Sequence, residues 1–168
     1  METAISGNRQ QISLPEDHAQ EARLKEAREL ADLGKLNESW EITKAYLRDV
    51  NPNHVGALLL ASKIFWTSRE YAEAYVFAKR SVDLGPEYSG TWLNLGCVSE
   101  ALYRFDEAEH AYRKALRKAE SPNKRLLVLN NFAAMYIQKG DWIAGEELAR
   151  QALQIDPEHK KARANLGT

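Results

Sequence analysis

The sequence predicts an all-α fold of about four helix–turn–helix units, followed by the start of a fifth. A proline recurs between helix-like segments at intervals of 34, 36 and 35 residues, at Pro52, Pro86, Pro122 and Pro157. This interval is the length of one pair of helices with its turns. A large apolar residue also recurs three positions before a small one, in the pairs Leu36 and Ser39, Tyr71 and Ala74, Phe105 and Ala108, and Trp142 and Gly145. We therefore expect units at about 20–54, 55–88, 89–125 and 126–159, with a partial unit or capping helix at 160–168.

Apolar residues within a unit follow the helical period. Phe105, Ala108, Tyr112 and Ala115 recur at steps of three and four residues, which places them on one stripe of a helix. Two helices that cross at about 8–10 Å need a residue without bulk where their backbones approach. Small residues are paired at a separation of 12 positions in Ser62 and Ala74, Gly96 and Ala108, and Ala133 and Gly145. Each pair is predicted to mark the crossing point of one helical hairpin.

Composition excludes several classes of function. The chain has 168 residues, with 23 Lys and Arg against 24 Asp and Glu, so its net charge of −1 argues against a nucleic-acid partner. Cys97 is the only cysteine and cannot form an internal disulfide. No segment has the apolar length of a membrane span, and the polar start lacks the apolar core of a signal peptide. We expect a cytoplasmic protein without a membrane partner, with a flexible leader at 1–16 and a single repeat domain at 17–168.

No motif in the sequence predicts catalysis. The four histidines, His18, His54, His110 and His159, do not have the spacing of metal ligands and are expected to be solvated loop and helix-face residues. A Gly-rich phosphate loop, a Gly-x-Ser-x-Gly elbow and a His-Glu-x-x-His motif are all absent from the sequence. We therefore predict that the protein is not an enzyme and has no catalytic residue, metal site or cofactor.

The best-defined unit resembles the tetratricopeptide repeat. Trp92, Leu95 and Gly96 are followed by Ala108 and Tyr112 at the spacing of that signature, with Ala115 and Pro122 behind them. Ser99 and Tyr103 depart from the family pattern, which usually has a tyrosine and a glycine there. The resemblance implies a right-handed superhelical solenoid of antiparallel helix pairs. It also implies a concave groove, lined by the first helix of each unit, that binds an extended peptide of a protein partner.

Asparagines recur at one position of the predicted groove, in Asn94, Asn131 and Asn165. A carboxamide offers both a donor and an acceptor, so it can pair with a peptide backbone whatever the side chains are. The row resembles the asparagine ladder of protein O-glycosyltransferase repeat domains, although asparagine is also common at this position without that use. The other groove candidates are Leu59, Lys63, Trp66, Leu93, Cys97, Glu100, Asn130, Ala134 and Gln138.

Two of these candidates have an alternative interpretation. Trp66 is either an anchor for a ligand side chain or a residue that packs on the adjacent helix. Cys97 is expected to be a small helix residue and not a nucleophile, because no base or cation is evident beside it. In some proteins that the chain resembles, two lysines, two asparagines and an arginine bind the C-terminal carboxylate of a peptide. This carboxylate clamp is not reproduced here, since only Lys63 and the asparagines correspond to members of the set.

The sequence leaves three functions open. We favour a non-enzymatic scaffold that binds a protein or peptide along its groove. The second possibility is an N-terminal part of a larger enzyme, such as a transferase, that recruits a substrate or partner. The third is self-association as a homodimer, because Asn165, Leu166 and Gly167 begin a fifth unit that leaves an uncapped apolar face at the C-terminal end.

Overall fold

A computed structural model describes residues 14–167, and every regular element in that range is an α-helix. The all-α class and the repeated helical hairpins are confirmed. The chain divides into two compact units, Met1–Pro52 and Asn53–Thr168, which we call unit 1 and unit 2. Of the predicted leader at 1–16, residues 1–13 lie outside the described range, and the first helix already begins at Leu14. A single repeat domain over 17–168 stays a prediction.

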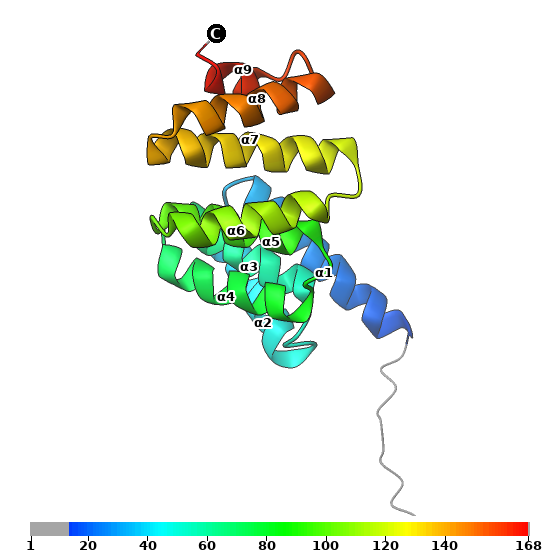
Figure 1. The fold of residues 1–168 in the computed structure, drawn as a ribbon. Helices are drawn as coiled ribbons and strands as arrows, with labels where there is room; N and C mark the ends of the chain where they lie inside the picture. Colours follow the sequence, from blue (N-terminus) through cyan, green and yellow to red (C-terminus); the bar gives the residue numbers. More distant parts are fainter. Residues whose placement is uncertain (1–13, 168) are drawn as a thin grey trace, which may run out of the picture. The chain divides into compact units, whose positions relative to one another are not determined.

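Unit 1 is one hairpin of two helices, α1 (Leu14–Asp32) and α2 (Leu36–Asp49) (Figure 1). The Ser39 hydroxyl donates a hydrogen bond of 2.7 Å to the carbonyl oxygen of Ala27, and both residues are fully buried. This contact joins the two helices where small residues let their backbones approach. The least regular unit of the sequence is therefore also a helical hairpin.

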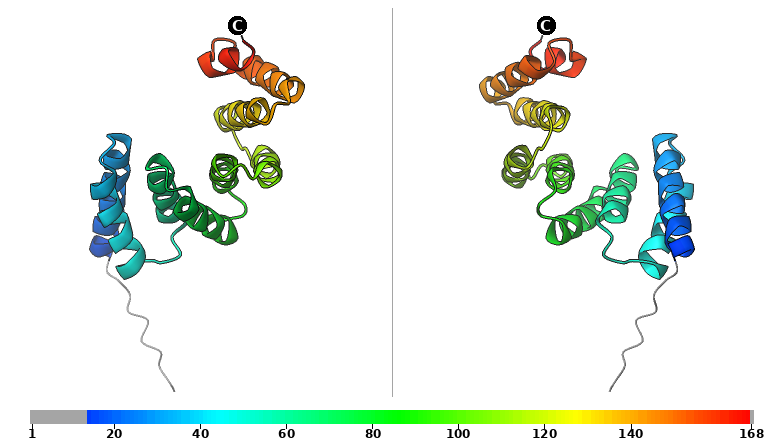
Figure 2. Two further views of the ribbon diagram at one scale, coloured as in Figure 1. Left: turned by 90° about the vertical axis from the view of Figure 1, so that its left-hand side faces the viewer. Right: turned by 90° about the vertical axis from the view of Figure 1, so that its right-hand side faces the viewer.

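Unit 2 contains three further hairpins and a short final helix (Figure 1 and Figure 2). Its elements are α3 (Val55–Thr67), α4 (Tyr71–Leu84), α5 (Ser89–Ala101), α6 (Phe105–Arg117), α7 (Pro122–Lys139), α8 (Trp142–Ile155) and α9 (Lys160–Asn165). The first helices of successive hairpins also touch one another, α3 with α5, α5 with α7, and α7 with α9. These first helices therefore form one continuous row along unit 2.

The predicted crossing points are close contacts in unit 2. The Ser62 hydroxyl donates a hydrogen bond of 2.9 Å to the carbonyl oxygen of Ala74. A Cβ atom placed on Gly145 would lie 3.1 Å from the carbonyl oxygen of Ala133. Ala108 is fully buried, and a Cβ atom on Gly96 would lie 2.7 Å from Cε1 of Tyr112. The small residues therefore set how closely the helices pack.

An aromatic column links the second and third hairpins of unit 2. The buried ring of Tyr112 on α6 stacks on Phe132 of α7 with ring centroids 5.3 Å apart. Phe132 in turn stacks on Tyr136 at 5.0 Å. Aromatic pairs of this kind contribute about 0.5–1.5 kcal/mol beyond the area that they bury. Neighbouring repeats are thus held together by stacked rings as well as by aliphatic packing.

Two of the histidines cap helices, which corrects the expectation that they are merely solvated. Nδ1 of His54 accepts a hydrogen bond of 3.1 Å from the backbone N–H of Ala57 at the start of α3. His159 does the same for Ala162 at the start of α9, at 3.3 Å. Each cap satisfies one of the backbone donors that a helix start leaves unpaired. Their equivalent positions in two units reflect this structural use.

The tight turn inside each hairpin uses a left-handed residue. Gly34 and Gly140 have φ angles of 77° and 90°, while Arg69 and Tyr103 hold the same conformation with φ angles of 64° and 58°. A side chain in this region costs about 1–2 kcal/mol because its Cβ crowds the following carbonyl. Tyr103, which departs from the family pattern in sequence, therefore strains the backbone at a position suited to glycine.

Tyr103→Gly is accordingly expected to raise the free energy of unfolding by about 1 kcal/mol, because the strain is relieved. Chemical denaturation followed by circular dichroism measures the change. Tyr103→Ala is the matched control, since alanine removes the ring but keeps the Cβ that causes the strain. An equal effect of the two substitutions would show that the side chain, and not the backbone, is responsible.

Candidate functional site

A cleft of about 360 Å³ lies along the row of first helices in unit 2. Its lining comes from α3, α5 and α7, the start of α4 and the turn between α5 and α6. The lining residues are Trp66, Tyr71, Cys97, Glu100, Ala101, Tyr103, Asn131 and Gln138. This volume is within the range of about 300–1,000 Å³ that is typical of ligand sites. Five of the predicted groove residues, Trp66, Cys97, Glu100, Asn131 and Gln138, therefore share one cavity.

Aromatic side chains form one part of the cleft. Trp66 lies at the C-terminal end of α3 and is 43% exposed, so part of its ring is accessible to a ligand. Tyr103 is 71% exposed, and its ring meets Phe105 edge-on at 6.0 Å. Tyr71 is the first residue of α4 and is half-buried. Three aromatic rings are thus available to a ligand in this cleft.

A hydrogen-bonded group lies at the polar part of the cleft. The Tyr112 hydroxyl donates a hydrogen bond of 2.6 Å to Oε2 of Glu100 and lies 3.5 Å from Sγ of Cys97. Burial raises the pKa of Glu100, and the hydrogen bond from Tyr112 opposes that rise. Burial also raises the pKa of the Cys97 thiol to about 11, so Cys97 is a neutral thiol near pH 7. The expectation that Cys97 is not a nucleophile agrees with this environment.

The three repeated asparagines have different surroundings. Nδ2 of Asn94 donates a hydrogen bond of 2.7 Å to Oγ of Ser62 on the preceding first helix. Nδ2 of Asn165 donates to the carbonyl oxygen of Asn130 at 3.2 Å and lies 3.3 Å from its Oδ1. Asn131 lines the cleft and donates to the carbonyl oxygen of Leu127 on its own helix, at 2.9 Å. The amide groups of Asn94 and Asn165 therefore join neighbouring repeats.

The remaining groove candidates lie outside the cleft. Asn130 is only 5% exposed and accepts the hydrogen bond from Asn165, so its side chain belongs to the interface between α7 and α9. Leu59 is half-buried, and Leu93 packs against the core that contains Tyr112 and Phe132. Lys63 is exposed on α3. Tyr71 and Tyr103 line the cleft although the sequence did not single them out as groove residues, because each lies next to a turn and outside the helical face counted from the repeats.

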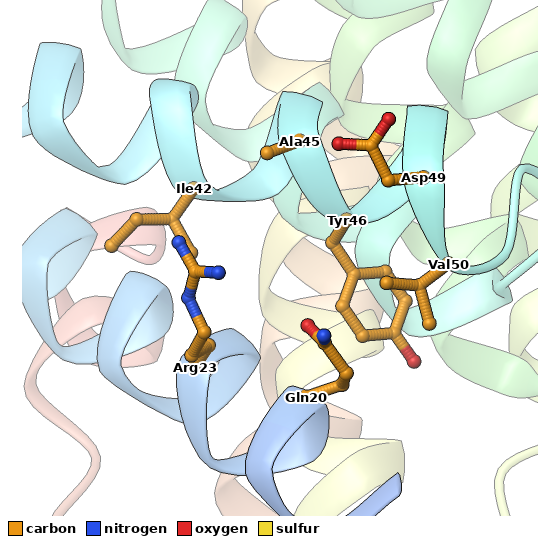
Figure 3. Close-up of a pocket in the computed structure, with 7 residues that line it drawn as sticks. All are labelled: Gln20, Arg23, Ile42, Ala45, Tyr46, Asp49 and Val50. Atoms are coloured by element: carbon orange, nitrogen blue, oxygen red, sulfur yellow. The ribbon is translucent and has the colours of Figure 1, made fainter. Parts of the chain in front are cut away.

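Unit 1 has a small cavity of about 70 Å³ between α1 and α2 (Figure 3). It is lined by Gln20, Arg23, Ile42, Ala45, Tyr46, Asp49 and Val50. This volume is far below the range of about 300–1,000 Å³ that is typical of ligand sites and below the 360 Å³ of the cleft in unit 2. The Tyr46 hydroxyl beside it donates a hydrogen bond of 2.7 Å to Glu21. We therefore place the candidate site in unit 2.

Neither a metal-binding cluster nor a membrane-spanning helix is found within residues 14–167. Among residues 14–167 no group of three or more His, Cys, Asp or Glu side chains is arranged to hold a metal ion. None of the helices in this described range combines the length and the apolar character that a membrane span requires. What remains is a helical-repeat scaffold with an open cleft along its first helices.

Comparison with known proteins identifies the repeat. The tetratricopeptide repeat family pattern matches residues 93–121 and 125–155, which contain α6, α8 and most of α5 and α7. The tetratricopeptide repeat-containing protein trd-1 of Caenorhabditis elegans is 31% identical over 111 residues, which cover 66% of this chain and 13% of the relative. Tetratricopeptide repeat protein 8 of the same organism is 25% identical over 146 residues, which cover 87% of this chain and 28% of the relative. Residues 93–121 and 125–155 thus match the tetratricopeptide repeat family, and the chain spans 13% and 28% of the length of these two relatives.

The fold also matches solved structures of tetratricopeptide repeat proteins. PilF of Pseudomonas aeruginosa aligns with a TM-score of 0.81 at 16% identity, over 89% of this chain and 67% of PilF. At that identity the likeness shows the fold alone. Proteins of this family are in general non-catalytic scaffolds for protein–protein interaction, and the fold of this chain is of that kind.

Proposed function

We propose that unit 2 binds an extended segment of a partner protein along the face formed by α3, α5 and α7. The observation that carries the proposal is the cleft of about 360 Å³, whose lining comes mainly from these three first helices. An occupant that touches all three must extend across three successive repeats. An extended peptide has this shape, and it is the form of ligand that the repeat row accommodates best.

The lining chemistry supports a peptide over a small molecule. Asn131 and Gln138 on α7 present carboxamides, which can donate to a peptide carbonyl and accept from a peptide N–H. Trp66 provides an exposed aromatic surface of the kind that anchors binding interfaces. The ladder hypothesis becomes narrower, because Asn94 and Asn165 each donate a hydrogen bond to a neighbouring repeat, whereas Asn131 bonds only within its own helix and lines the cleft. In our proposal Asn131 is the main backbone-reading residue, through its second N–H and its oxygen.

Selection from a displayed library of random peptides tests this proposal. Peptides selected on the native chain should lose at least tenfold in affinity when Trp66→Ala or Asn131→Ala is introduced. Each variant has a control of the same residue type elsewhere in unit 2. Trp142 is 66% exposed on α8, and Asn123 is exposed on α7; neither lines this cleft.

Trp142→Ala and Asn123→Ala should therefore leave the affinity unchanged. Isothermal titration calorimetry gives the dissociation constants, and circular dichroism confirms that all four variants are folded. Equal losses in the cleft variants and in their controls would contradict the proposal, as would a failure to select any peptide that depends on the cleft.

The other two functions considered from the sequence stay predictions. A role in recruiting a substrate to a larger enzyme rests on the small part of the curated relatives that this chain spans. Self-association has one supporting observation, since Trp142 and Ile143 at the start of α8 are 66% and 84% exposed. The cleft favours peptide binding over both. The cytoplasmic location and the absence of a nucleic-acid partner also stay predictions.

A further inference from the structure

The cleft contains one carboxyl group that the protein does not pair with a cation. Glu100 is the only Asp, Glu, Lys, Arg or His among its lining residues, and the Cys97 thiol is neutral near pH 7. No lysine, arginine or histidine of residues 14–167 forms an ion pair with Glu100. Its only hydrogen-bond donor in that range is the hydroxyl of Tyr112, at 2.6 Å. A partly buried carboxylate therefore faces the cleft without a cation.

Other carboxylates of the same hairpin are paired. Glu107 lies 3.6 Å from the Arg104 guanidinium, and Glu109 lies 2.8 Å from Arg113. Burial raises the pKa of Glu100, whereas the hydrogen bond from Arg113 lowers the pKa of Glu109. Removing a carboxylate from water without a cation is unfavourable for folding. Glu100 thus lowers the stability of the hairpin, and a cationic ligand would offset that cost.

The rest of the cleft suits a cation as well. Trp66, Tyr71 and Tyr103 line the same cavity, and the face of an aromatic ring attracts a cation through its quadrupole. The Oε2 atom of Glu100 accepts from Tyr112, which leaves Oε1 as the acceptor for a ligand. A guanidinium can stack on an aromatic ring while it donates to a carboxylate, and an ammonium can do so less completely. Aromatic rings and one carboxylate are the combination that recognises a basic side chain.

We infer that the cleft holds a basic side chain of the bound segment, preferably arginine, between the aromatic rings and the Glu100 carboxylate. This inference rests on the proposed function and specifies the partner as a basic segment. The Glu100 carboxylate supplies a charge-assisted hydrogen bond, Trp66 and Tyr103 supply the stacking surface, and Asn131 reads the adjacent backbone. The segment is thereby recognised by one charged position and by its extended backbone.

The peptide library described above also tests this inference. Peptides enriched on the native chain should carry arginine or lysine at one fixed position. For the best such peptide, replacing the arginine by citrulline, its neutral isostere, should weaken binding about tenfold. Glu100→Gln should remove this difference, because glutamine keeps an acceptor for Tyr112 but lacks the charge. Glu146→Gln on α8 is the control for a general loss of negative charge, since Glu146 does not line this cleft.

The outcomes separate the inference from the function on which it rests. Peptides that depend on Trp66 and Asn131 but show no basic position, or keep the preference in Glu100→Gln, would overturn the inference and leave the proposed function intact. Binding that does not depend on those two residues would overturn both. If Glu100→Gln lost its fold by circular dichroism, the comparison would be made in Trp66→Ala instead. There the advantage of arginine over citrulline should fall, and an unchanged advantage would overturn the inference.

Discussion

Tyr112→Ala is expected to lower the free energy of unfolding by about 3–5 kcal/mol, the loss that is typical of truncating a large buried aromatic residue. Tyr112 is fully buried, stacks on Phe132, and fills the space beside Gly96. Removing its ring leaves a cavity between α5, α6 and α7 and breaks the aromatic column. Urea denaturation followed by circular dichroism measures the loss. Tyr103→Ala, at a tyrosine that is 71% exposed, is the control and should cost less than about 1 kcal/mol.

Tyr112→Phe separates the hydroxyl from the ring. The pKa of Glu100 is raised by burial, so the folded chain binds this proton more tightly than the unfolded chain does. Stability from this group is therefore present below the unfolded pKa and is lost as pH rises through the folded pKa. Phenylalanine removes the hydrogen bond that lowers the pKa of Glu100, and the pKa rises further. The stability gap between the native chain and Tyr112→Phe should accordingly widen as pH rises, and Glu100→Gln should abolish that pH dependence.

Gly96→Ala and Gly90→Ala are expected to act in opposite directions, although both positions lie in α5. A Cβ atom on Gly96 would lie 2.7 and 2.8 Å from two ring carbons of Tyr112, whose ring is fixed by its own packing. This overpacking should lower the free energy of unfolding by about 1–3 kcal/mol, despite the better helix propensity of alanine. A Cβ atom on Gly90 meets nothing within 4 Å, so alanine there should raise stability by up to about 1 kcal/mol.

Thermal and chemical unfolding of both variants measure these changes. The pair tests the same substitution in one helix, so helix propensity is nearly matched and packing is the main difference. Two changes of the same sign would show that Gly96 does not set the distance between α5 and α6.

The repeat was predictable from the sequence because large apolar residues and small residues recur at fixed spacing. Leu36, Tyr71, Phe105 and Trp142 begin the second helix of their hairpins, and the small residues three positions later lie at or near the crossing points. A helix that packs on a neighbour cannot vary these positions freely. Tyr103 shows the limit of the pattern, because the left-handed turn keeps its geometry even where glycine is absent. Residues 14–16 show a second limit, since α1 begins before any periodicity is visible in the sequence.

The cleft was predictable only in part. Helical spacing placed Trp66, Cys97 and Asn131 on the inner face, and all three line the cleft. Spacing does not say whether a polar side chain is already bonded to its neighbours, and this is why Asn94 and Asn130 differ from expectation. The environment of Glu100 depends on Tyr112, which comes from the other helix of the hairpin. A hydrogen bond between two helices cannot be inferred from the period of either one.

The bond from Asn94 to Ser62 bears on how unit 2 unfolds. Ser62 accepts from Asn94 on α5 and donates to the carbonyl oxygen of Ala74 on α4, so one hydroxyl joins three helices of two hairpins. In a linear array, stability is the sum of the intrinsic energy of each repeat and the coupling energy between nearest neighbours. Here a single group contributes to both energies. Loosening the hairpin of α3 and α4 therefore also weakens its coupling to the hairpin of α5 and α6, which makes unfolding of the two more cooperative.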